Sequence, residues 1–361
     1  MRMLHPQLLA DNVPLHAEQR LLILNSAADP FVQVAARQLS RGRIILAEDN
    51  VSALEQAYAV PARSQLQHIP FHEYTRETSP NTIDVAVMNL LYQPSKAWIY
   101  YGLEAARYAL KPGGRLYVTG AKDRGILSIA RRMREYFGNL ETVEISKGWR
   151  VVAAEKTAET PVPAEPPAWP QREVFAGGEL DEGTRLLLDS LEVYVTDVAL
   201  DLGCGAGYIG MHIAERARKG SVTLVDASLA AVALAQQQLQ AKGLTNAQAL
   251  PSDATSAVSG QRFSLIATNP PFHVWGVNTK AIGERFIRES ARLLNHRRGR
   301  FYLVANRFLK YEPVLEECFE EVQEVGGNSR YKVLRATSPV RPGRRVEREE
   351  ELTQLYKKGW R

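Results

Sequence analysis

The sequence predicts two consecutive α/β domains, each built on a doubly wound and mostly parallel sheet. On both sides of a proline-rich segment, short β-branched runs alternate with amphipathic helical stretches. The runs of one half can be laid over those of the other in the same order. The 361 residues are also enough for two separate cores. We therefore expect a first domain at 1–156, a linker at 157–170 and a second domain at 171–361.

The composition is that of a soluble globular protein, with 45% hydrophobic and 24% charged residues. No apolar run reaches the length of a membrane span, and the first residues lack the apolar core of a signal peptide. Two cysteines provide neither a disulfide framework nor a metal cluster. These features predict a cytoplasmic protein with no membrane contact and no metal site. Two domains in one chain also favour a monomer.

The net charge of +5 is too small to indicate a nucleic-acid partner by itself. Its placement is more informative, because five basic residues fall in one short segment of the first half: Lys122, Arg124, Arg131, Arg132 and Arg134. Guanidinium groups suit phosphates and the faces of bases. The segment therefore predicts either an RNA-binding surface or an ordinary solvated helix face.

The two halves match along most of their length. "LLILNSAADPF" aligns with "VALDLGCGAGY", and "IDVAVMNLLYQP" aligns with "FSLIATNPPFHV". Asn89 then stands opposite Asn269, and Glu48 stands opposite Asp226. Matches of this extent predict a duplicated domain. An unrelated α/β domain in the first half is the alternative.

The two copies differ where a ligand would bind. Three glycines in the loop after the first strand of the second copy correspond to Asn25, Ala27 and Asp29 in the first, and "NPPF" corresponds to "NLLY". Side chains then fill space that backbone would need in order to approach a ligand. We expect the first domain to be a degenerate, non-catalytic copy. The segment between the copies, "TAETPVPAEPPAWP", predicts an extended, semi-rigid linker.

The glycine loop "DLGCGAGYIG" lies between a predicted strand and a predicted helix. Glycines there permit a tight turn and a close approach of backbone to a ligand at the helix N-terminus. The same letters fit a dinucleotide fingerprint. However, Asp201 just before the loop would repel a pyrophosphate and attract a cation. S-adenosylmethionine has no phosphate and carries a sulfonium and an ammonium group, so we predict this methyl donor instead of a nicotinamide.

Two more carboxylates extend this predicted donor site. Asp226 ends the second strand, where it can accept hydrogen bonds from both ribose hydroxyls, and Asp253 follows the third, where it can accept from the adenine amino group. The full set of predicted donor-binding residues is Asp201, Gly203, Cys204, Gly205, Gly207, Asp226, Ala227, Asp253, Ala254 and Asn269.

The fourth strand of the second copy ends in Asn269, Pro270, Pro271 and Phe272. In an open parallel sheet this end faces the ligand crevice. An NH₂ group conjugated to a π-system is a poor nucleophile, and two acceptors that grip its N–H bonds would orient it for in-line methyl transfer. The Asn269 side-chain oxygen and the Pro270 carbonyl can be those acceptors, while Pro271 stiffens the turn and Phe272 stacks on a planar substrate.

His273 follows this motif. It can be a substrate contact, an essential base or a residue that packs at the strand end. No strong base is needed before attack, because the methylated nitrogen becomes acidic and loses its proton afterwards.

"DLGCGAG" together with "NPPF" resembles the class I amino-group methyltransferases. "VFAGGELDEGTRLLL" (174–188), "LVANRFLKYEPVLEECF" (303–319) and "YKVLRAT" look specifically like the ribosomal guanine-N2 methyltransferases of the RsmC type, and the first half resembles the degenerate N-terminal domain of that family. The resemblance implies two tandem Rossmann-like domains with seven-stranded sheets. It also implies S-adenosylmethionine as donor and the N2 amine of a guanosine in 16S rRNA, nominally position 1207 on the 30S subunit, as target.

Other substrates and one other class of protein remain open at this point. A 23S rRNA guanosine, a DNA adenine or a protein glutamine would need the same chemistry, although enzymes for the last two commonly have tyrosine where Phe272 stands. A non-enzymatic ribosome-assembly factor is the alternative outside enzymes. Val274 to Gly276 also depart from the small polar pair that is commoner in the family, and the charged tail after Pro342 has no family motif.

Overall fold

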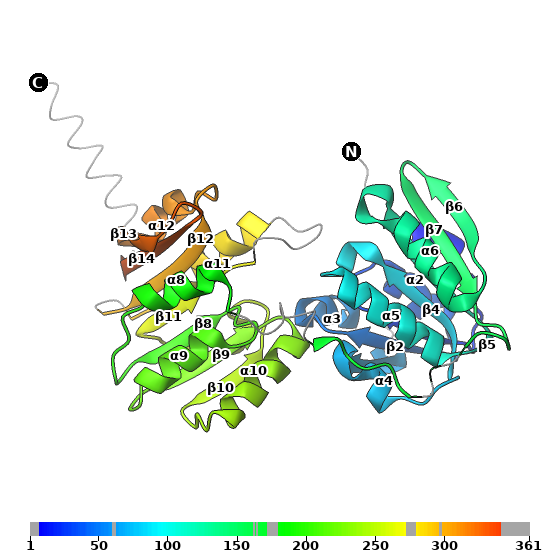
Figure 1. The fold of residues 1–361 in the computed structure, drawn as a ribbon, viewed down its shortest axis with the longest axis horizontal. Coiled ribbons are helices and arrows are strands. Elements are labelled where there is room, and N and C mark those ends of the chain that lie inside the picture. The colour runs from blue at the N-terminus through cyan, green and yellow to red at the C-terminus, as the bar shows by residue number, and fades with distance from the viewer. Residues whose placement is uncertain are drawn as a thin grey trace, which may run out of the picture. The chain divides into compact units, whose positions relative to one another are not determined.

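The computed structural model describes residues 7–59, 63–161, 163, 165–171, 180–271, 279–295 and 298–340. The chain divides into two compact units, the first made mainly of residues up to Glu179 and the second mainly of residues from Leu180 onward (Figure 1). Phe272, His273 and the charged tail lie outside the described residues.

The first unit contains a seven-stranded sheet. Its strands are β1 (Arg20–Leu24), β2 (Arg43–Glu48), β3 (Leu66–Pro70), β4 (Ile83–Asn89), β5 (Leu110–Ala121), β6 (Glu141–Ser146) and β7 (Trp149–Glu155). Their order is β3-β2-β1-β4-β5-β7-β6. β7 runs antiparallel to both of its neighbours, and the other pairs are parallel. The strand order therefore reverses between β1 and β4, which is where open α/β sheets bind ligands.

Amphipathic helices cover both faces of this sheet. α1 (Leu8–Asn12), α2 (Phe31–Gln38) and α3 (Val51–Tyr58) pack on one face. α4 (Tyr74–Glu77), α5 (Lys96–Ala109) and α6 (Ile126–Phe137) pack on the other, together with the short 3₁₀ segment η3 (Phe71–Glu73). Two further 3₁₀ segments, η4 (Leu90–Tyr92) and η5 (Lys122–Arg124), follow β4 and β5.

The second unit repeats this architecture. Its strands are β8 (Val198–Leu202), β9 (Ser221–Asp226), β10 (Ala247–Pro251), β11 (Leu265–Thr268), β12 (Arg300–Asn306), β13 (Phe319–Gly327) and β14 (Tyr331–Pro339). Their order is β10-β9-β8-β11-β12-β14-β13, again with the last two pairs antiparallel. α8 (Glu182–Ser190), α9 (Tyr208–Arg216) and α10 (Leu229–Ala241) lie on one face, and α11 (Thr279–Leu293) and α12 (Glu312–Cys318) lie on the other.

Both sheets have the same order and the same antiparallel edge, so the predicted tandem, doubly wound fold is confirmed. Glu48 and Asp226 each end the second strand of their sheet. Asn89 ends the fourth strand of the first sheet, and Asn269 directly follows the fourth strand of the second. The duplicated positions deduced from the sequence therefore occupy equivalent places in the two units.

The proline-rich linker is packed against the first unit along part of its length. The Trp169 ring meets the rings of Trp98 and Tyr101 edge to face at 4.8 and 5.0 Å. The Thr75 hydroxyl donates a hydrogen bond to the Pro167 carbonyl at 2.7 Å. The extended, semi-rigid linker stays a prediction, and the half-buried Trp169 ring packs the end of the segment on the aromatic core of the first unit.

No helix in the described ranges has the length and apolar character needed to span a membrane. Within those same ranges, His, Cys, Asp and Glu side chains do not gather in groups of three that could hold a metal ion. The candidate site lies at the carboxyl ends of the second unit's parallel strands.

Candidate functional site

The glycine loop begins where β8 ends and is fastened to the neighbouring strand. The N–H groups of Gly203 and Cys204 both donate to the Val225 carbonyl of β9 at 2.9 Å. Gly203, Gly205 and Gly207 have φ values of 75°, 52° and 85°, a left-handed backbone that favours glycine. A side chain on Gly205 would meet nothing within 4 Å, so bare backbone faces open space at this point. Gly207 then caps α9, and the loop forms a cradle at a helix N-terminus.

Asp201 lies beneath this cradle and is fully buried. Its Oδ2 accepts a hydrogen bond from the Gly210 N–H at 2.7 Å, whereas its Oδ1 is buried without a partner among the described residues. Burial, aided by the nearby Asp226 carboxylate, raises the pKa of Asp201 to about 7. An unpaired buried carboxylate oxygen is costly, and a cation beside it would offset that cost. The environment of Asp201 therefore fits a positively charged ligand.

Two further predicted site residues, Asp226 and Cys204, lie at the glycine loop. Asp226 Oδ2 accepts from the Gly205 N–H at 2.9 Å, which holds the loop against the end of β9, and half-buried Ala227 follows it. The role of Asp226 toward a ribose stays a prediction. Burial is the main factor that raises the pKa of the Cys204 thiol, so the group stays protonated and has no nucleophilic character.

Asp253 has a partner that the sequence did not suggest. Its carboxylate receives two hydrogen bonds from Arg285 of α11, at 2.8 and 3.0 Å, and Arg285 also binds Glu289 at 2.6 Å. Ala254, directly after it, is buried and has a left-handed φ of 48°. Recognition of an adenine amino group by Asp253 stays a prediction, and in this structure it would share the carboxylate with Arg285.

Asn269 is held in a defined orientation directly after β11. Its Nδ2 donates to Thr184 Oγ1 at 2.8 Å and to the two Asp181 carboxylate oxygens at 3.3 and 3.4 Å. Because both acceptors lie on the nitrogen side of the amide, they fix which end is nitrogen. The oxygen, Oδ1, points the other way and is buried without a hydrogen-bond partner in the described part of the chain. The site therefore presents one fixed acceptor with a vacant lone pair.

Asp181 and Thr184 come from the first turn of α8. Asp181 caps the helix, accepting from the Thr184 N–H at 3.0 Å, and its Oδ2 also accepts from the Thr184 hydroxyl at 2.5 Å. The sequence analysis did not identify the use of this cap in orienting Asn269. The sequence signal that could have indicated this contact is a carboxylate and a hydroxyl three residues apart at the start of a predicted helix.

The rest of the Asn269 motif is described only in part. Pro270 is buried and Pro271 is half-buried. Phe272 and His273, the predicted stacking residue and its neighbour, lie outside the described residues. The Thr268 hydroxyl donates to the Leu202 carbonyl at 2.7 Å, which ties the end of β11 to the end of β8. The motif and the glycine loop are therefore joined at the strand ends.

The equivalent crevice of the first unit is closed by its own side chains. Asn89 Nδ2 donates to Asp29 Oδ2 at 2.7 Å, and Asn89 Oδ1 accepts from the Leu91 N–H at 2.9 Å. Gln93 donates across the loop to the Asn25 carbonyl at 2.9 Å. Asn25, Asp29, Asn89 and Gln93 are all buried. The acceptor that is vacant on Asn269 is thus occupied on Asn89.

The first unit shares two backbone features with the glycine loop of the second unit. The Ala27 N–H donates to Glu48 Oε2 at 2.8 Å, matching the Gly205 bond to Asp226 in the second unit. Asn25 keeps a left-handed φ of 43° at the position that corresponds to Gly203. The duplication is therefore visible in single hydrogen bonds as well as in strand order.

The predicted basic segment maps to η5 and α6 of the first unit. Lys122, Arg131 and Arg134 are exposed, and Arg124 is half-buried. Arg132 is also half-buried, where it forms an ion pair with Glu135 at 3.2 Å. The structure therefore brings these residues to one helix and its preceding turn, and it directs Arg132 to neighbouring side chains.

The chain was then compared with known proteins. The family model "Methyltransferase small domain" matches residues 168–335. The chain is 31% identical to the ribosomal RNA small subunit methyltransferase C of Shewanella halifaxensis over 347 residues, which cover 91% of this chain and 97% of that protein. It is 30% identical to the protein of the same name from Shewanella piezotolerans over 345 residues, covering 91% and 96%. The chain belongs to the ribosomal RNA small subunit methyltransferase C family.

A solved member of the ribosomal RNA small subunit methyltransferase C family has the same fold. The 16S rRNA N2 G1207 methyltransferase (RsmC) of T. thermophilus, solved in complex with AdoMet and guanosine, superposes with a TM-score of 0.74. The two chains are 31% identical, and the match covers 92% of this chain and 91% of that one. The fold is thus shared with this relative over nearly the whole chain, and the resemblance found in the sequence motifs is confirmed.

Proposed function

We propose that the chain methylates the exocyclic N2 amine of a guanosine in 16S rRNA, nominally position 1207 in the 30S subunit, with S-adenosylmethionine as donor. One observation carries the proposal. The Asn269 oxygen is a buried acceptor without a hydrogen-bond partner among the described residues, and Thr184 and Asp181 hold the amide in place. Asn269 lies directly after β11, whose end is bonded to the end of β8 where the glycine loop begins. The complex of the T. thermophilus relative with AdoMet and guanosine supports both ligands. We place this activity in the cytoplasm, with the chain acting as a monomer.

The residues around the loop fit the donor. The buried, unpaired oxygen of Asp201 would face its positive charges, and the bare backbone at Gly205 leaves room beside Asp226. Asp226 and Asp253 would bind the ribose and the adenine, with the loop glycines and the alanines after each carboxylate lining the cradle. When bound, S-adenosylmethionine supplies an electrophilic methyl group on a sulfonium.

The residues after β11 would position the amine. Asn269 Oδ1 accepts one N–H of the guanine amine and the Pro270 carbonyl accepts the other, which aims the nitrogen lone pair along the line of transfer. Phe272 would stack on the base, and His273 would line the pocket beside it. The nitrogen loses its proton after transfer, so this chain need only orient the amine and exclude water.

The first unit is proposed to recognise RNA. Buried, hydrogen-bonded Asn89, Asp29 and Gln93 lie at its own strand ends, while α6 presents exposed Arg131 and Arg134. A guanine must be unpaired or flipped out of a helix to reach the Asn269 motif. Contacts to the surrounding RNA would hold the target in that state.

The test is incubation with labelled S-adenosylmethionine and, separately, unmodified 30S subunits, 50S subunits and free rRNA, followed by nucleoside analysis. N2-methylguanosine in 16S rRNA is the expected product. Asn269→Ala should keep donor binding and lower transfer by about 10²-fold or more, as loss of a positioned acceptor does. Label confined to 50S RNA, or absent from every RNA, would contradict the proposed target.

A further inference from the structure

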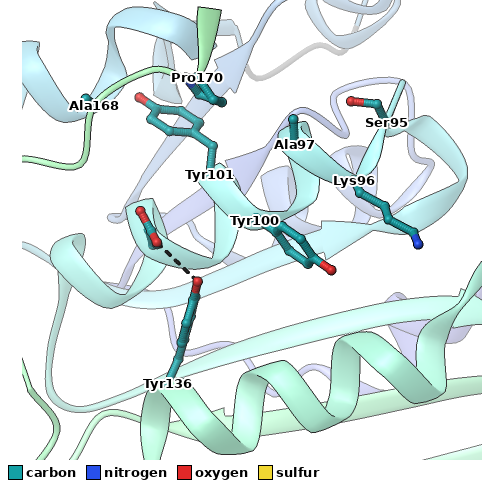
Figure 2. A pocket seen from close by; sticks show the side chains of 9 residues that line it. Ser95, Lys96, Ala97, Tyr100, Tyr101, Tyr136, Ala168 and Pro170 are labelled. Carbon is teal, nitrogen blue, oxygen red and sulfur yellow. Dashed lines mark hydrogen bonds between the residues drawn. The ribbon is translucent and has the colours of Figure 1, made fainter. Parts of the chain in front are cut away.

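A cavity of about 530 Å³ opens on the first unit, bounded by α5, α6 and the last described residues of the proline-rich linker (Figure 2). Lys96, Tyr100 and Glu104 line it from α5, and Tyr136 lines it from α6. The three α5 residues are spaced four apart and therefore share one helix face. None of the residues that close the degenerate crevice lines this cavity. It is a separate feature of the first unit.

Aromatic and guanidinium groups form a stack at the cavity wall. The Arg132 guanidinium lies 5.0 Å from the centre of the Tyr100 ring and 5.4 Å from that of Tyr136. Arg107 lies 4.9 Å from the Tyr136 ring. Both tyrosines are half-buried. Exposed aromatic rings backed by arginine are a surface on which nucleobases stack, independent of sequence.

Three of the residues that line the cavity, Ser95, Lys96 and Glu104, have polar side chains. The Tyr136 hydroxyl donates a hydrogen bond to Glu104 Oε1 at 3.1 Å, and both residues line the cavity. Ser95 Oγ, also on the lining, is buried and has no hydrogen-bond partner among the residues that the structure describes. A carboxylate repels a phosphate and accepts from base N–H groups. The exposed Lys96 at the helix start provides the opposite charge for a phosphate.

We propose that this cavity binds one unpaired nucleotide of the RNA substrate. The base stacks on Tyr100 and presents N–H donors to Glu104, and the adjoining phosphate contacts Lys96. This inference rests on the proposed action of the chain on RNA. It adds a contact site on the non-catalytic unit, separate from the target guanosine.

The test uses the full-length protein, a single-stranded 16S rRNA fragment that spans position 1207, and unmodified 30S subunits. Tyr100→Ala should raise the Kd for the fragment by about 5- to 100-fold, the usual effect of losing one base stack, and raise KM for 30S subunits with kcat unchanged. Tyr100→Phe should retain wild-type binding. Lys96→Glu, at an exposed position, provides a second variant that does not disturb the core. Leu127→Ala, an exposed apolar residue of α6 outside the cavity lining, is the control.

Each outcome separates this inference from the proposed function. If folded Tyr100→Ala and Lys96→Glu proteins bind the fragment within about twofold of wild type, the cavity is not an RNA site. Weaker binding to 30S subunits with unchanged binding to the fragment would assign the cavity to a ribosomal protein and overturn the inference. Fragment binding that depends on Tyr100, in a wild-type protein that methylates no RNA, would support the cavity and contradict the proposed activity.

Discussion

Replacing Thr184 by valine tests whether α8 orients the Asn269 amide for the proposed methyl transfer. The substitution keeps the β-branched shape and removes one hydroxyl, which accepts from Asn269 Nδ2 at 2.8 Å and donates to Asp181 Oδ2 at 2.5 Å. After the change, the Asn269 amide retains only the longer contacts to Asp181, at 3.3 and 3.4 Å. The amide can then rotate, and its oxygen no longer has a single direction.

The size of the effect follows from the lost hydrogen bond. A neutral hydrogen bond contributes about 1 kcal/mol net, and bonds beyond about 3.2 Å contribute less. If that energy orients the acceptor, Thr184→Val should lower kcat/KM by about fivefold, since about 1.4 kcal/mol is a factor of ten. Thr184 is buried, so the free energy of unfolding should also fall by roughly 1 kcal/mol.

A double-mutant cycle separates orientation from simple loss of stability. Single-turnover methyl transfer to 30S subunits is measured for wild type, Thr184→Val, Asn269→Ala and the double variant at a temperature where all four are folded. In the Asn269→Ala background the valine should have almost no further effect on transfer. Thr184→Ser keeps the hydroxyl and should retain most of the activity. Calorimetry should give the same donor affinity for all of them.

An equal fivefold loss of transfer from Thr184→Val with and without the Asn269 side chain would refute the orienting role of Thr184. Thr184 would then act on the fold of the loop or on the donor. Loss of donor affinity in Thr184→Val with transfer restored at saturating donor would lead to the same conclusion.

Three other predictions follow from separate parts of the structure. The pKa of Asp201, about 7, should fall when a cationic donor binds. Donor affinity should therefore rise between pH 6 and 8, and calorimetry in two buffers of different ionisation enthalpy should detect proton release; a pH-independent affinity would contradict this. Without donor, the free energy of unfolding should fall as the pH rises from about 4 to 7, because the folded state keeps a proton on Asp201 that the unfolded state has lost. Asp201→Asn should remove this pH dependence. Phe308 is 69% exposed and lies just after β12, the strand that pairs with β11. Phe308→Ser should weaken RNA binding by about 1 kcal/mol or more in a filter assay, with an unchanged Kd as the contrary result. Arg131→Glu with Arg134→Glu should reduce the slope of log K against log salt by about 1 to 2, and an unchanged slope would remove α6 from the RNA surface.

The fold was predictable because its signals are local and repeated. Hydrophobic runs marked the parallel strands, and glycine marked the loop after β8. Because the two halves align, each predicted strand could be compared with its counterpart in the other half. Asn89 and Asn269 could therefore be placed at equivalent strand ends from the sequence alone. Asp201 and Asp226 could be placed near strand ends for the same reason, and their roles toward a donor stay predictions.

The contacts that complete the site were not predictable in this way. Asp181 meets Asn269 across 88 residues of sequence, and Arg285 meets Asp253 across 32. Helix periodicity predicts which face of α8 or α11 is buried. It does not predict which residue forms a hydrogen bond with a polar side chain at the edge of that face. The packing of Trp169 against the first unit was missed for a related reason, because proline content predicts extended backbone and says nothing about what an aromatic ring in that segment will contact.

The two copies differ at the position two residues after the asparagine, and this difference predicts a role for the second proline of the Asn269 motif. In the first unit the Leu91 N–H, two residues after Asn89, turns back to occupy the Asn89 oxygen. The equivalent position in the second unit is Pro271, which has no N–H, so the chain cannot satisfy Asn269 Oδ1 in the same way. Pro271→Leu should restore that internal bond and lower kcat/KM by roughly 5- to 10-fold through competition for the acceptor, at unchanged donor affinity. Pro270→Ala is the matched control, because it loosens the turn without adding an N–H two residues after Asn269. Equal losses in the two variants would show that stiffness alone matters, whereas a loss confined to Pro271→Leu would show that the proline keeps the acceptor vacant for the substrate amine.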